Sequence, residues 1–235
     1  MTHRVALITG VGPGLGASLA RRFAREGFAV ALVARSSDFI QELAHEISGA
    51  GVKAISIAAD VSRPAEIKSA VERVRAELGA IGVLVHNASS SSGNGLLGTT
   101  PEEFEQTWRT ATLGAFVCAQ ETAPDMLSAG EGAMLFTGAT SSVRGGGWLA
   151  FSSAKFALRG LAQSLARELW PQGIHVAHVV IDGIIGEAGA IAGSNADPLL
   201  DPDRIAEAYW QLANQHRSAW TLELDVRPHA EQFFV

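Results

Sequence analysis

The sequence has little of three things that each mark a class of protein. Its single cysteine, Cys118, cannot form a disulfide within the chain, which favours a reducing compartment over a secreted location. Its 18 lysines and arginines are outnumbered by 24 acidic residues and form no basic block, which disfavours nucleic-acid binding. No apolar run approaches the roughly 18 residues of a membrane span. We therefore expect neither nucleic acid nor membrane as a partner.

What the sequence does have is the composition of a folded domain. Of its 235 residues, 47% are hydrophobic and 18% are charged, which supplies a sizeable core and excludes a disordered chain. The length allows a single large α/β domain. Residues 1–4 lead directly into an apolar segment, so we expect no signal peptide and a cytoplasmic location.

Strand-like and helix-like segments alternate from the start of the chain. Val5–Thr9 is an apolar run of strand length, residues 17–26 carry apolar side chains at helical spacing, and Ala29–Ala34 is a second apolar run. This order predicts a βαβ unit with parallel strands and a right-handed crossover. The same alternation then predicts strands at 52–57, 83–86, 133–137, 174–181 and 221–226, and helices at 38–47, 63–78, 101–127 (interrupted near Thr110), 149–170 and 202–215.

Seven strands separated by helices, with no internal repeat and no linker, predict one α/β domain over residues 1–235. We expect a doubly wound (Rossmann) fold, with a mostly parallel seven-stranded sheet and helices on both faces. Within it we expect the nucleotide-binding part at about residues 1–95 and the catalytic and substrate part at about 96–235.

A glycine-rich turn, Thr9-Gly-Val-Gly-Pro-Gly-Leu-Gly16, lies where the first strand meets the first helix. Glycines permit positive φ and let the backbone approach a pyrophosphate, and the start of the helix offers free N–H groups and partial positive charge. The position between a strand and a helix favours a dinucleotide site over the alternative, a structural turn that binds nothing.

The end of the second strand predicts which dinucleotide binds. An NAD site usually has a carboxylate here for the ribose hydroxyl, whereas this chain has Ala34 followed by Arg35. An arginine can pair with the 2′-phosphate of NADP(H), so we expect NADP(H) to be preferred over NAD(H). The alternative is that Arg35 is only a solvated loop residue.

Five short segments follow predicted strands or begin a helix, and they form one ordered set: Thr9-Gly10-x-x-x-Gly14-x-Gly16, Asp60-Val61, Asn87-Ala88, Phe151-Ser-Ser-Ala-Lys155 and Asp182-Gly183. In this order they resemble the short-chain dehydrogenase/reductase family over nearly the whole chain. The resemblance implies a set of cofactor-binding residues: Thr9, Gly10, Pro13, Gly14, Leu15, Gly16, Arg35, Asp60, Val61, Asn87, Ala88, Lys155, Gly183 and Ile185. Pro13 stands where many NADP-preferring members carry a basic residue.

The active-site motif departs from the family at the tyrosine. The family uses this tyrosine as acid/base and a lysine four residues later to lower its pKa and hold the ribose. Here Lys155 is present, but Phe151 occupies the tyrosine position and has no proton to give. The spacing of four residues still places both side chains on one helix face, so the resemblance implies a degenerate active site.

The family's serine and asparagine have no clear counterpart either. The usual distance back from Phe151 reaches Gly138, or Ala139 if one residue is deleted. Thr140, Ser141 and Ser142 follow closely, and Ser141 is the hydroxyl we take as candidate. The position of the asparagine falls near Ala111.

These losses leave several functions open. Because a positioned general acid contributes ~10²–10⁴ in rate, losing the tyrosine predicts an impaired or unusual reductase. Lys155 itself, a water on Lys155, or Asp182 are alternative proton donors. We expect an NADP(H)-dependent oxidoreductase acting on a small carbonyl or alcohol. The alternative is a nucleotide-binding pseudoenzyme that acts as a sensor or partner subunit, and lyase or isomerase chemistry on the same scaffold also stays open.

Some other residues have simpler interpretations. His86 is expected to be structural, and His175 and His178 lack the partners of a metal site, so we expect no metal. The segment 183–197 is expected to shape the substrate pocket, although its side chains show no pattern. The helices at 101–127 and 149–170 resemble those with which family members form homodimers and homotetramers, so a homo-oligomer is expected.

Overall fold

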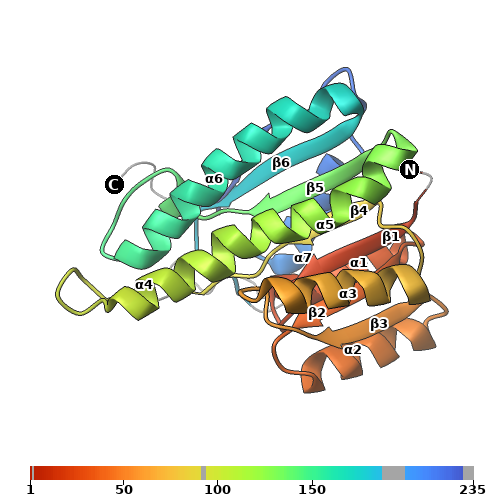
Figure 1. The fold of residues 1–235 in the computed structure, drawn as a ribbon, viewed down its shortest axis with the longest axis horizontal. Helices are drawn as coiled ribbons and strands as arrows, with labels where there is room; N and C mark the ends of the chain where they lie inside the picture. Colours follow the sequence, from red (N-terminus) through yellow and green to blue (C-terminus); the bar gives the residue numbers. More distant parts are fainter. Residues whose placement is uncertain (2, 91–93, 187–198, 230–235) are drawn as a thin grey trace.

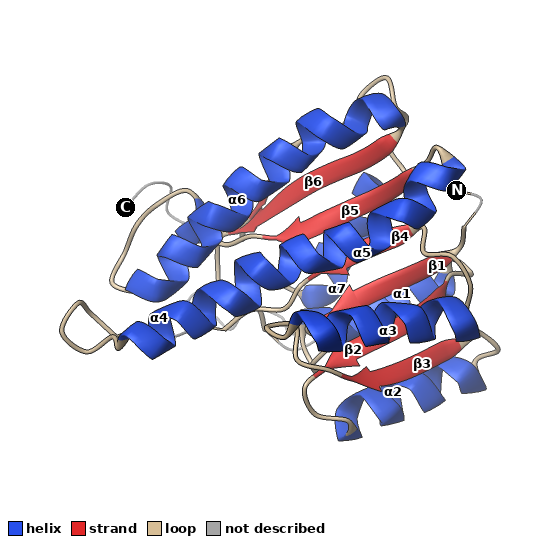
Figure 2. Cartoon of the chain, in the orientation of Figure 1, coloured by secondary structure: helices blue, strands red, loops and turns tan. Residues whose placement is uncertain are grey.

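The computed structural model describes residues 1, 3–90, 94–186 and 199–229 of the chain. It confirms the doubly wound α/β fold: a seven-stranded sheet with helices on both faces (Figures 1 and 2). The strand order is 3-2-1-4-5-6-7 and all six pairings are parallel. The strands are β1 (Val5–Thr9), β2 (Ala29–Ala34), β3 (Ala54–Ala58), β4 (Val83–His86), β5 (Gly132–Thr137), β6 (Ile174–Ile181) and β7 (Glu223–Val226).

The central strands read as continuous apolar runs because both faces of the sheet are covered. Every residue of β1, β4, β5 and β6 is buried. Continuous burial of this kind is the usual state of parallel strands between helical layers. It explains why short runs such as Val5–Thr9 were recognisable as strands without any alternation of polar and apolar residues.

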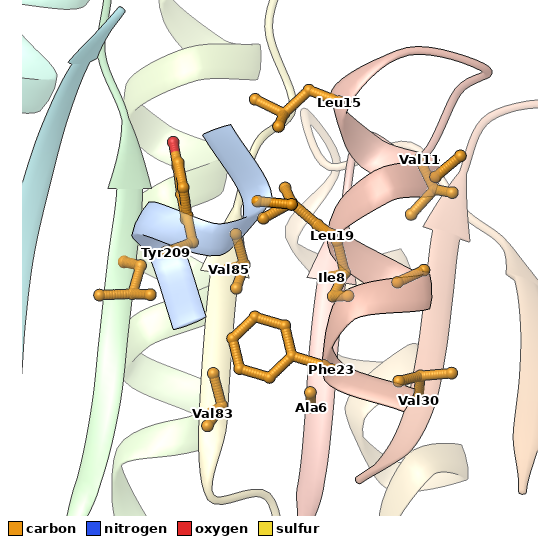
Figure 3. Close-up of a cluster of buried hydrophobic side chains, with 14 of the residues drawn as sticks. Ala6, Ile8, Val11, Leu15, Leu19, Phe23, Val30, Val83, Val85 and Tyr209 are labelled. Carbon is orange, nitrogen blue, oxygen red and sulfur yellow. The ribbon is translucent and has the colours of Figure 1, made fainter. Parts of the chain in front are cut away.

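Helices α1 (Leu15–Arg25), α2 (Asp38–Gly49) and α7 (Pro202–Ala213) cover one face of the sheet. Phe23 of α1 makes edge-on ring contacts with Phe28 and with Trp210 of α7, at centroid distances of 5.8 and 5.6 Å. Figure 3 shows this layer, with Phe23 and Leu19 of α1 facing Val85 of β4 and Tyr209 of α7. These aromatic contacts pack α7, which comes late in the chain, against α1, the first helix.

Helices α3 (Pro64–Glu77), α5 (Gly114–Ala129) and α6 (Leu149–Leu169) cover the opposite face, in front of the strands in Figure 2. A short α4 (Pro101–Trp108) precedes α5 and packs against α6 (Figure 1). Thr100 begins α4 with a reciprocal capping pair to Glu103, which satisfies two N–H groups at the helix start.

The interruption predicted near Thr110 is confirmed as one turn of π-helix, η1 (Arg109–Leu113), between α4 and α5. Thr112 within it donates a hydrogen bond to the carbonyl of Ala154 in α6, at 2.9 Å. Just beyond, Gly114 approaches the loop after β3 so closely that a Cβ would lie 2.8 Å from the carbonyl oxygen of Val61. π-turns occur often at functional sites, and this one contains Ala111, the residue near which the position of the family's asparagine is predicted.

Three predicted starts were wrong by two residues, and so were the predicted ends of α2, α5 and α7. α1 begins at Leu15 rather than residue 17. β3 begins at Ala54 rather than 52 because the N–H of Val52 completes the end of α2 by bonding to Ile47. β7 begins at Glu223 rather than 221 because the N–H of Thr221 bonds to the side chain of Gln215.

The strand order creates a switch point at the carboxyl end of β1. The chain leaves β1 toward β2 on one side, and β4 lies on the other. In open α/β sheets, ligands bind in the crevice outside the carboxyl ends of the strands at such a point. The glycine-rich turn lies at this place.

Candidate active site

Two adjoining cavities of about 460 and 340 Å³ open at the switch point, and both are lined by Gly10, Gly12, Asn87 and Ser89. We call the two together the cleft. The larger cavity contains the predicted residues Gly14, Leu15, Gly16, Phe151, Lys155, Gly183 and Ile185. The smaller one contains Arg35, Asp60, Val61 and Ala88. With Gly10 and Asn87, which line both cavities, thirteen predicted residues from separate parts of the chain line one continuous space.

The glycine-rich turn has the shape of an anion cradle. Gly10 has φ of +72°, and a Cβ there would lie 2.5 Å from the nitrogen of Ala88, so only glycine fits. Gly12 and Gly14 face open space. α1 begins next to them with no side-chain cap and no acidic residue in its first turn. The start of α1 therefore keeps its N–H groups and partial positive charge for a ligand.

The smaller cavity combines one arginine and one carboxylate. Arg35 is exposed at the end of β2, and Asp60 follows β3. Burial alone would raise the pKa of Asp60, but the N–H of Ser62, 2.9 Å from Oδ1, and the positive charges of Arg35 and Arg63 hold it below its ordinary value. Asp60 is thus an anion with a fixed orientation, beside an exposed arginine.

Lys155 lies at the other end of the cleft and is 2% exposed. Its Nζ donates a hydrogen bond of 2.7 Å to the carbonyl of Thr137 at the end of β5. Burial lowers the pKa of Lys155 from its ordinary value to about 8. The side chain can therefore exist with or without its proton near neutral pH, and it is anchored by the strand beside it.

Phe151 lies on the same face of α6 as Lys155, as the spacing predicts. Its ring centroid is 5.4 Å from Lys155 Nζ and 6.1 Å from the ring of Trp148. The ring lines the cleft instead of turning into the core. An aromatic face next to an ammonium group stabilises its charge but provides no exchangeable proton.

Three predicted site residues do not line the cleft. Thr9 is buried, and its hydroxyl lies 3.0 Å from Nδ1 of His86. Pro13 is exposed, and Ser141 is half-buried in the short 3₁₀ turn η2 (Thr140–Ser142). Ser142, next to Ser141, is completely buried and accepts a hydrogen bond from the N–H of Ala139 at 3.0 Å.

Asp182 is buried at the end of β6 and is engaged by three side chains. The Thr140 hydroxyl donates to Oδ1, while Arg144 and Arg227 lie 2.9 and 3.0 Å from Oδ2. Asp182 is not among the residues that line the cleft. This arrangement is that of a structural ion pair that joins η2 to β6 and to the segment after β7.

His86 ends β4 and is completely buried. Burial, together with the positive charge of Lys155, lowers the pKa of His86 to about 3. Backbone hydrogen bonding to Thr110 and Ala111 opposes this lowering but does not outweigh it. His86 is therefore a neutral ring within electrostatic range of the cleft lysine.

Gly138 is one of the two positions, with Ala139, at which the family's spacing predicts the serine, and the space next to Gly138 is filled. A Cβ on Gly138 would collide with the ring of His178 from β6, with Cε1 at 2.5 Å and Nε2 closer still, and it would lie 2.9 Å from Ser142 Oγ. Two polar side chains therefore converge on a residue that lines the cleft and has no side chain of its own. The sequence analysis considered His178 only for a metal site, a role it did not favour, and missed this contact.

A signal in the sequence was available. His175 and His178 are three residues apart on one strand, so they point to opposite faces of the sheet. His175 pairs with Ala133 in one core layer, and His178 pairs with Phe136 in the other, the layer beneath α6. The alternation of side chains along β6 thus indicates that, of these two histidines, only His178 faces α6, the helix that carries Lys155.

The chain's one tyrosine does not replace the missing one. Tyr209 of α7 is completely buried on the opposite face of the sheet, where its hydroxyl lies 2.7 Å from Oγ1 of Thr137. Burial raises the pKa of Tyr209. The side chain therefore acts as a packed core residue that fixes the end of β5.

The segment expected to shape the substrate pocket is only partly described. Gly183 and Ile185 line the cleft, and Ile185 forms a parallel bridge with Leu200. Residues 187–198 lie outside the described residues. Across the described ranges, no group of three or more His, Cys, Asp or Glu is arranged to hold a metal ion. The same ranges contain no helix long and apolar enough to cross a membrane.

Comparisons with known proteins agree with this geometry. The model of the short chain dehydrogenase family matches residues 4–197. The chain is 31% identical over 202 residues to a 3-oxoacyl-[acyl-carrier-protein] reductase of Staphylococcus epidermidis, covering 85% of this chain and 83% of the relative. The chain therefore belongs to the short-chain dehydrogenase/reductase family and is an oxidoreductase of that type.

Solved structures place the fold in the same family. The crystal structure of a short-chain dehydrogenase from Rhodopseudomonas palustris is 37% identical, with a TM-score of 0.84 over 96% of this chain and 98% of the other. A metagenomic short-chain oxidoreductase in complex with NADP is 28% identical, with a TM-score of 0.85 over 97% of this chain and 98% of the other. The similarity thus extends over nearly the whole fold.

Proposed function

We propose that this protein is an NADP(H)-dependent oxidoreductase that interconverts a small carbonyl compound and the corresponding alcohol. The main support for the proposal is that the cleft is continuous. Arg35 and Asp60 line one end of the cleft and Lys155 lines the other, and the glycine-rich turn lies between them. A dinucleotide needs this order of ribose, pyrophosphate and nicotinamide contacts.

The residues fit such a cofactor. The open space over Gly12 and Gly14 and the uncapped start of α1 suit the pyrophosphate. Arg35 suits a 2′-phosphate, because Ala34 removes the carboxylate that would repel it, and Lys155 suits the nicotinamide ribose. The nicotinamide supplies or accepts the hydride when bound. The remaining predicted contacts, Thr9 and Pro13 included, belong to this proposal as supports of the turn.

The names of the relatives support the same chemistry. One similar structure holds NADP, and the staphylococcal relative is a reductase of a 3-oxoacyl group. Both are compatible with NADP(H) and a carbonyl substrate. For this chain we propose only the substrate class, a small carbonyl compound or alcohol. A narrower assignment is not made because Phe151 and Gly138 change the substrate end of the cleft.

A second candidate function rests on the same departures. Phe151 stands at the predicted tyrosine position, Gly138 or Ala139 at that of the serine, and the asparagine position falls near Ala111, while the nucleotide end keeps its glycine motif. A protein that binds NADP(H) without redox turnover, as a sensor or as the partner of another subunit, would have this pattern.

One pair of measurements separates the two functions. Calorimetry with NADPH and NADH measures binding, and the loss of NADPH absorbance with a panel of small aldehydes and ketones measures turnover. We expect NADPH to bind more tightly than NADH, and at least one carbonyl compound to be reduced. Tight binding without any turnover would favour the pseudoenzyme, and no binding at millimolar nucleotide would exclude both functions.

We also propose that the chain is a cytoplasmic homodimer or homotetramer. The described surface of α4, α5 and α6 exposes large apolar side chains, among them Trp108, Phe116 and Phe156. The three helices lie together on one face of the molecule (Figure 1). Large apolar side chains exposed on neighbouring helices are a common feature of surfaces that another chain covers. Light scattering of the wild type and a Phe116→Glu variant tests this, and a monomeric wild type would exclude it.

A further inference from the structure

Among the residues that the structure describes, the larger cavity of the cleft is lined by one titratable side chain, that of Lys155. The other polar side chains on its wall belong to Asn87, Ser89 and Thr137. The amide of Asn87 donates a hydrogen bond of 2.9 Å to a backbone carbonyl, and the Thr137 hydroxyl lies 2.7 Å from that of Tyr209. Amides and aliphatic hydroxyl groups do not titrate near neutral pH. Lys155 is therefore the group on this wall that can gain and lose a proton.

Titratable groups on the elements around α6 are paired or neutral. The ion pairs there are Asp182 with Arg144 and Arg227, Glu223 with Arg159, and Glu105 with Arg109. His86 and His178 are buried, which lowers their pKa values to about 3 and about 4, so both rings are neutral near pH 7. None of these residues lines the cleft. They therefore do not compete with Lys155 for a proton on a bound substrate.

The amino group of Lys155 has three positions besides its bond to Cε. One is fixed, because Nζ donates a hydrogen bond of 2.7 Å to the carbonyl of Thr137. The second suits the nicotinamide ribose of the proposed cofactor. The third carries a hydrogen in the ammonium form and a lone pair in the neutral form. The ring of Phe151, with its centroid 5.4 Å from Nζ, has no hydroxyl group to take this third position.

Both forms of the amino group are accessible close to neutral pH. Lys155 is 2% exposed, and burial lowers its pKa to about 8. An acid or base is most effective when its pKa lies near the working pH. The face of the Phe151 ring stabilises the ammonium form but exchanges no proton with it. A lysine in these surroundings can release and regain a proton in each turnover, whereas an arginine cannot be deprotonated.

We propose that Lys155 is the proton-exchanging residue of this active site, with the third position of Nζ bonded directly to the substrate oxygen. This inference rests on the proposed function and adds a second role to the lysine that suits the ribose. Lys155 forms one wall of the cavity together with Phe151, Gly138 and Ala139. A small substrate bound in that cavity has Lys155 as the neighbour with a transferable proton.

The step balances in either direction. In alcohol oxidation, the O–H bond of the substrate breaks and its proton forms a bond to the lone pair of neutral Nζ, while the hydride on the alcohol carbon leaves for the bound oxidised nicotinamide. The substrate becomes the carbonyl compound and the amino group becomes an ammonium, which then loses its proton to solvent. Reduction is the reverse, with the ammonium protonating the carbonyl oxygen. Oxidation therefore needs the neutral form and reduction the charged form, so their rates depend on pH in opposite directions.

The first test measures the amino group without turnover. The chain has three lysines, and Lys53 and Lys68 are exposed, so they serve as internal references. In ¹³C-lysine NMR of the ligand-free protein, the Cε shift of each lysine is followed against pH, and the Lys155 signal is assigned by its absence from Lys155→Met. We expect the Lys155 signal to titrate with a midpoint near pH 8. A midpoint at about 10.4, the ordinary value for lysine, would overturn the inference.

The second test compares wild type with Lys155→Arg, using NADP⁺ and a panel of small secondary alcohols. Arginine keeps a cationic donor for the ribose but cannot act as a base, so we expect NADP⁺ affinity by calorimetry to be largely kept. We expect kcat to fall on the order of 10²-fold or more, because general base catalysis contributes ~10²–10⁴. In wild type, kcat/KM for oxidation should rise with pH and level off above about pH 8, and this bend should disappear in the variant. Lys68→Arg, at an exposed position of α3, is the matched control.

A further variant keeps the inference testable if Lys155→Arg does not fold. Lys155→Ala leaves space for a small primary amine, and added methylamine, ethylamine and 2-fluoroethylamine should restore turnover at rates that follow the pKa of the amine. Rates of rescue that are independent of the amine's pKa would overturn the inference. So would a folded, NADP⁺-binding Lys155→Arg variant with wild-type kcat and an unchanged pH profile. If wild type itself turns over no alcohol or carbonyl compound, the proposed function fails instead, so the two failures are distinguishable.

Discussion

The two ends of the cleft differ in how their side chains arise from the sequence. The nucleotide end is assembled from turns that immediately follow β1, β2 and β3, and each turn contains its motif within a few residues. The substrate end is assembled from β5, α6 and the segment after β6, where Phe151, Gly138 and Lys155 meet. The first end keeps the family's pattern and the second departs from it. Backbone contacts to a phosphate need glycines at fixed places, whereas several kinds of side chain can move a proton.

The largest effect is expected at the nucleotide end, for Gly10→Ala. The substitution combines a left-handed φ with a Cβ 2.5 Å from the backbone of Ala88, so we expect a loss of about 2–5 kcal/mol in the free energy of unfolding and of NADP(H) binding. Urea denaturation and calorimetry measure the two. Gly51→Ala is the control, since Gly51 has φ of +87° but open space around it. Equal destabilisation by both variants would show that the close approach of Gly10 to Ala88 is unimportant.

Because His86 is buried, we expect the stability of the folded protein to fall at acid pH. The pKa of His86 is about 3 in the folded chain and about 6.5 when unfolded, so the folded state resists protonation. The stability that His86 contributes is fully present above about pH 6.5 and is lost as the pH falls toward 3, at about 1.4 kcal/mol per pH unit. Urea denaturation from pH 7 to pH 4 measures this slope. His86→Asn should flatten it, and an unchanged slope would contradict the burial argument.

The substrate end should respond to Phe151→Tyr. The ring already lines the cleft beside Lys155, so the change adds a hydroxyl whose pKa the neighbouring ammonium lowers. We expect a rise in kcat of about 10²-fold, the lower part of the range for a general acid, because serine and asparagine partners are absent. Steady-state rates measure it. Phe156→Tyr, on the exposed side of the same helix, is the control. No gain in rate, with the fold intact, would indicate that another group already supplies the proton.

The smallest effect is expected from Arg35→Ala. We expect it to weaken NADPH binding by ~1.5–3 kcal/mol and to leave NADH binding nearly unchanged, because only NADPH carries the 2′-phosphate. Calorimetry with both nucleotides measures the difference. Arg63→Ala is a matched control, since Arg63 also lies near Asp60 but does not line the cleft. Equal losses for both nucleotides would mean that Arg35 does not recognise the phosphate.

The fold was predictable because its signals are local. Continuous apolar runs of strand length, such as Ala29–Ala34, are typical of strands between two helical layers, and the helices between them show amphipathic spacing. Even the interruption of the long helix near Thr110 was visible in the sequence. Errors were confined to boundaries, where tertiary bonds decide which residue begins the strand. Thr221 is an example, because its N–H binds the Gln215 side chain and its carbonyl receives His175.

The candidate site was predictable to different degrees at its two ends. The residues of the glycine-rich turn, with Arg35 and Asp60, follow from position in the chain and lie together as expected. The proton donors suggested at the other end had no spacing rule behind them. The structure places Asp182 in an ion-paired cluster with Arg144 and Arg227, and Ser141 outside the cleft. Proximity of side chains on different strands cannot be obtained from the order of residues alone.

The sequence by itself determined the α/β alternation, the family motif and the loss of the tyrosine, because each depends on residues near one another in the chain. Only the tertiary structure decided what stands beside Gly138. His178 reaches it from the neighbouring strand, and Glu223 and Arg159 orient the ring from a third strand and a helix. The physical reason is the sheet register: pairing β5 with β6 and β6 with β7 brings distant residues to one level, where burial and charge then set their chemistry.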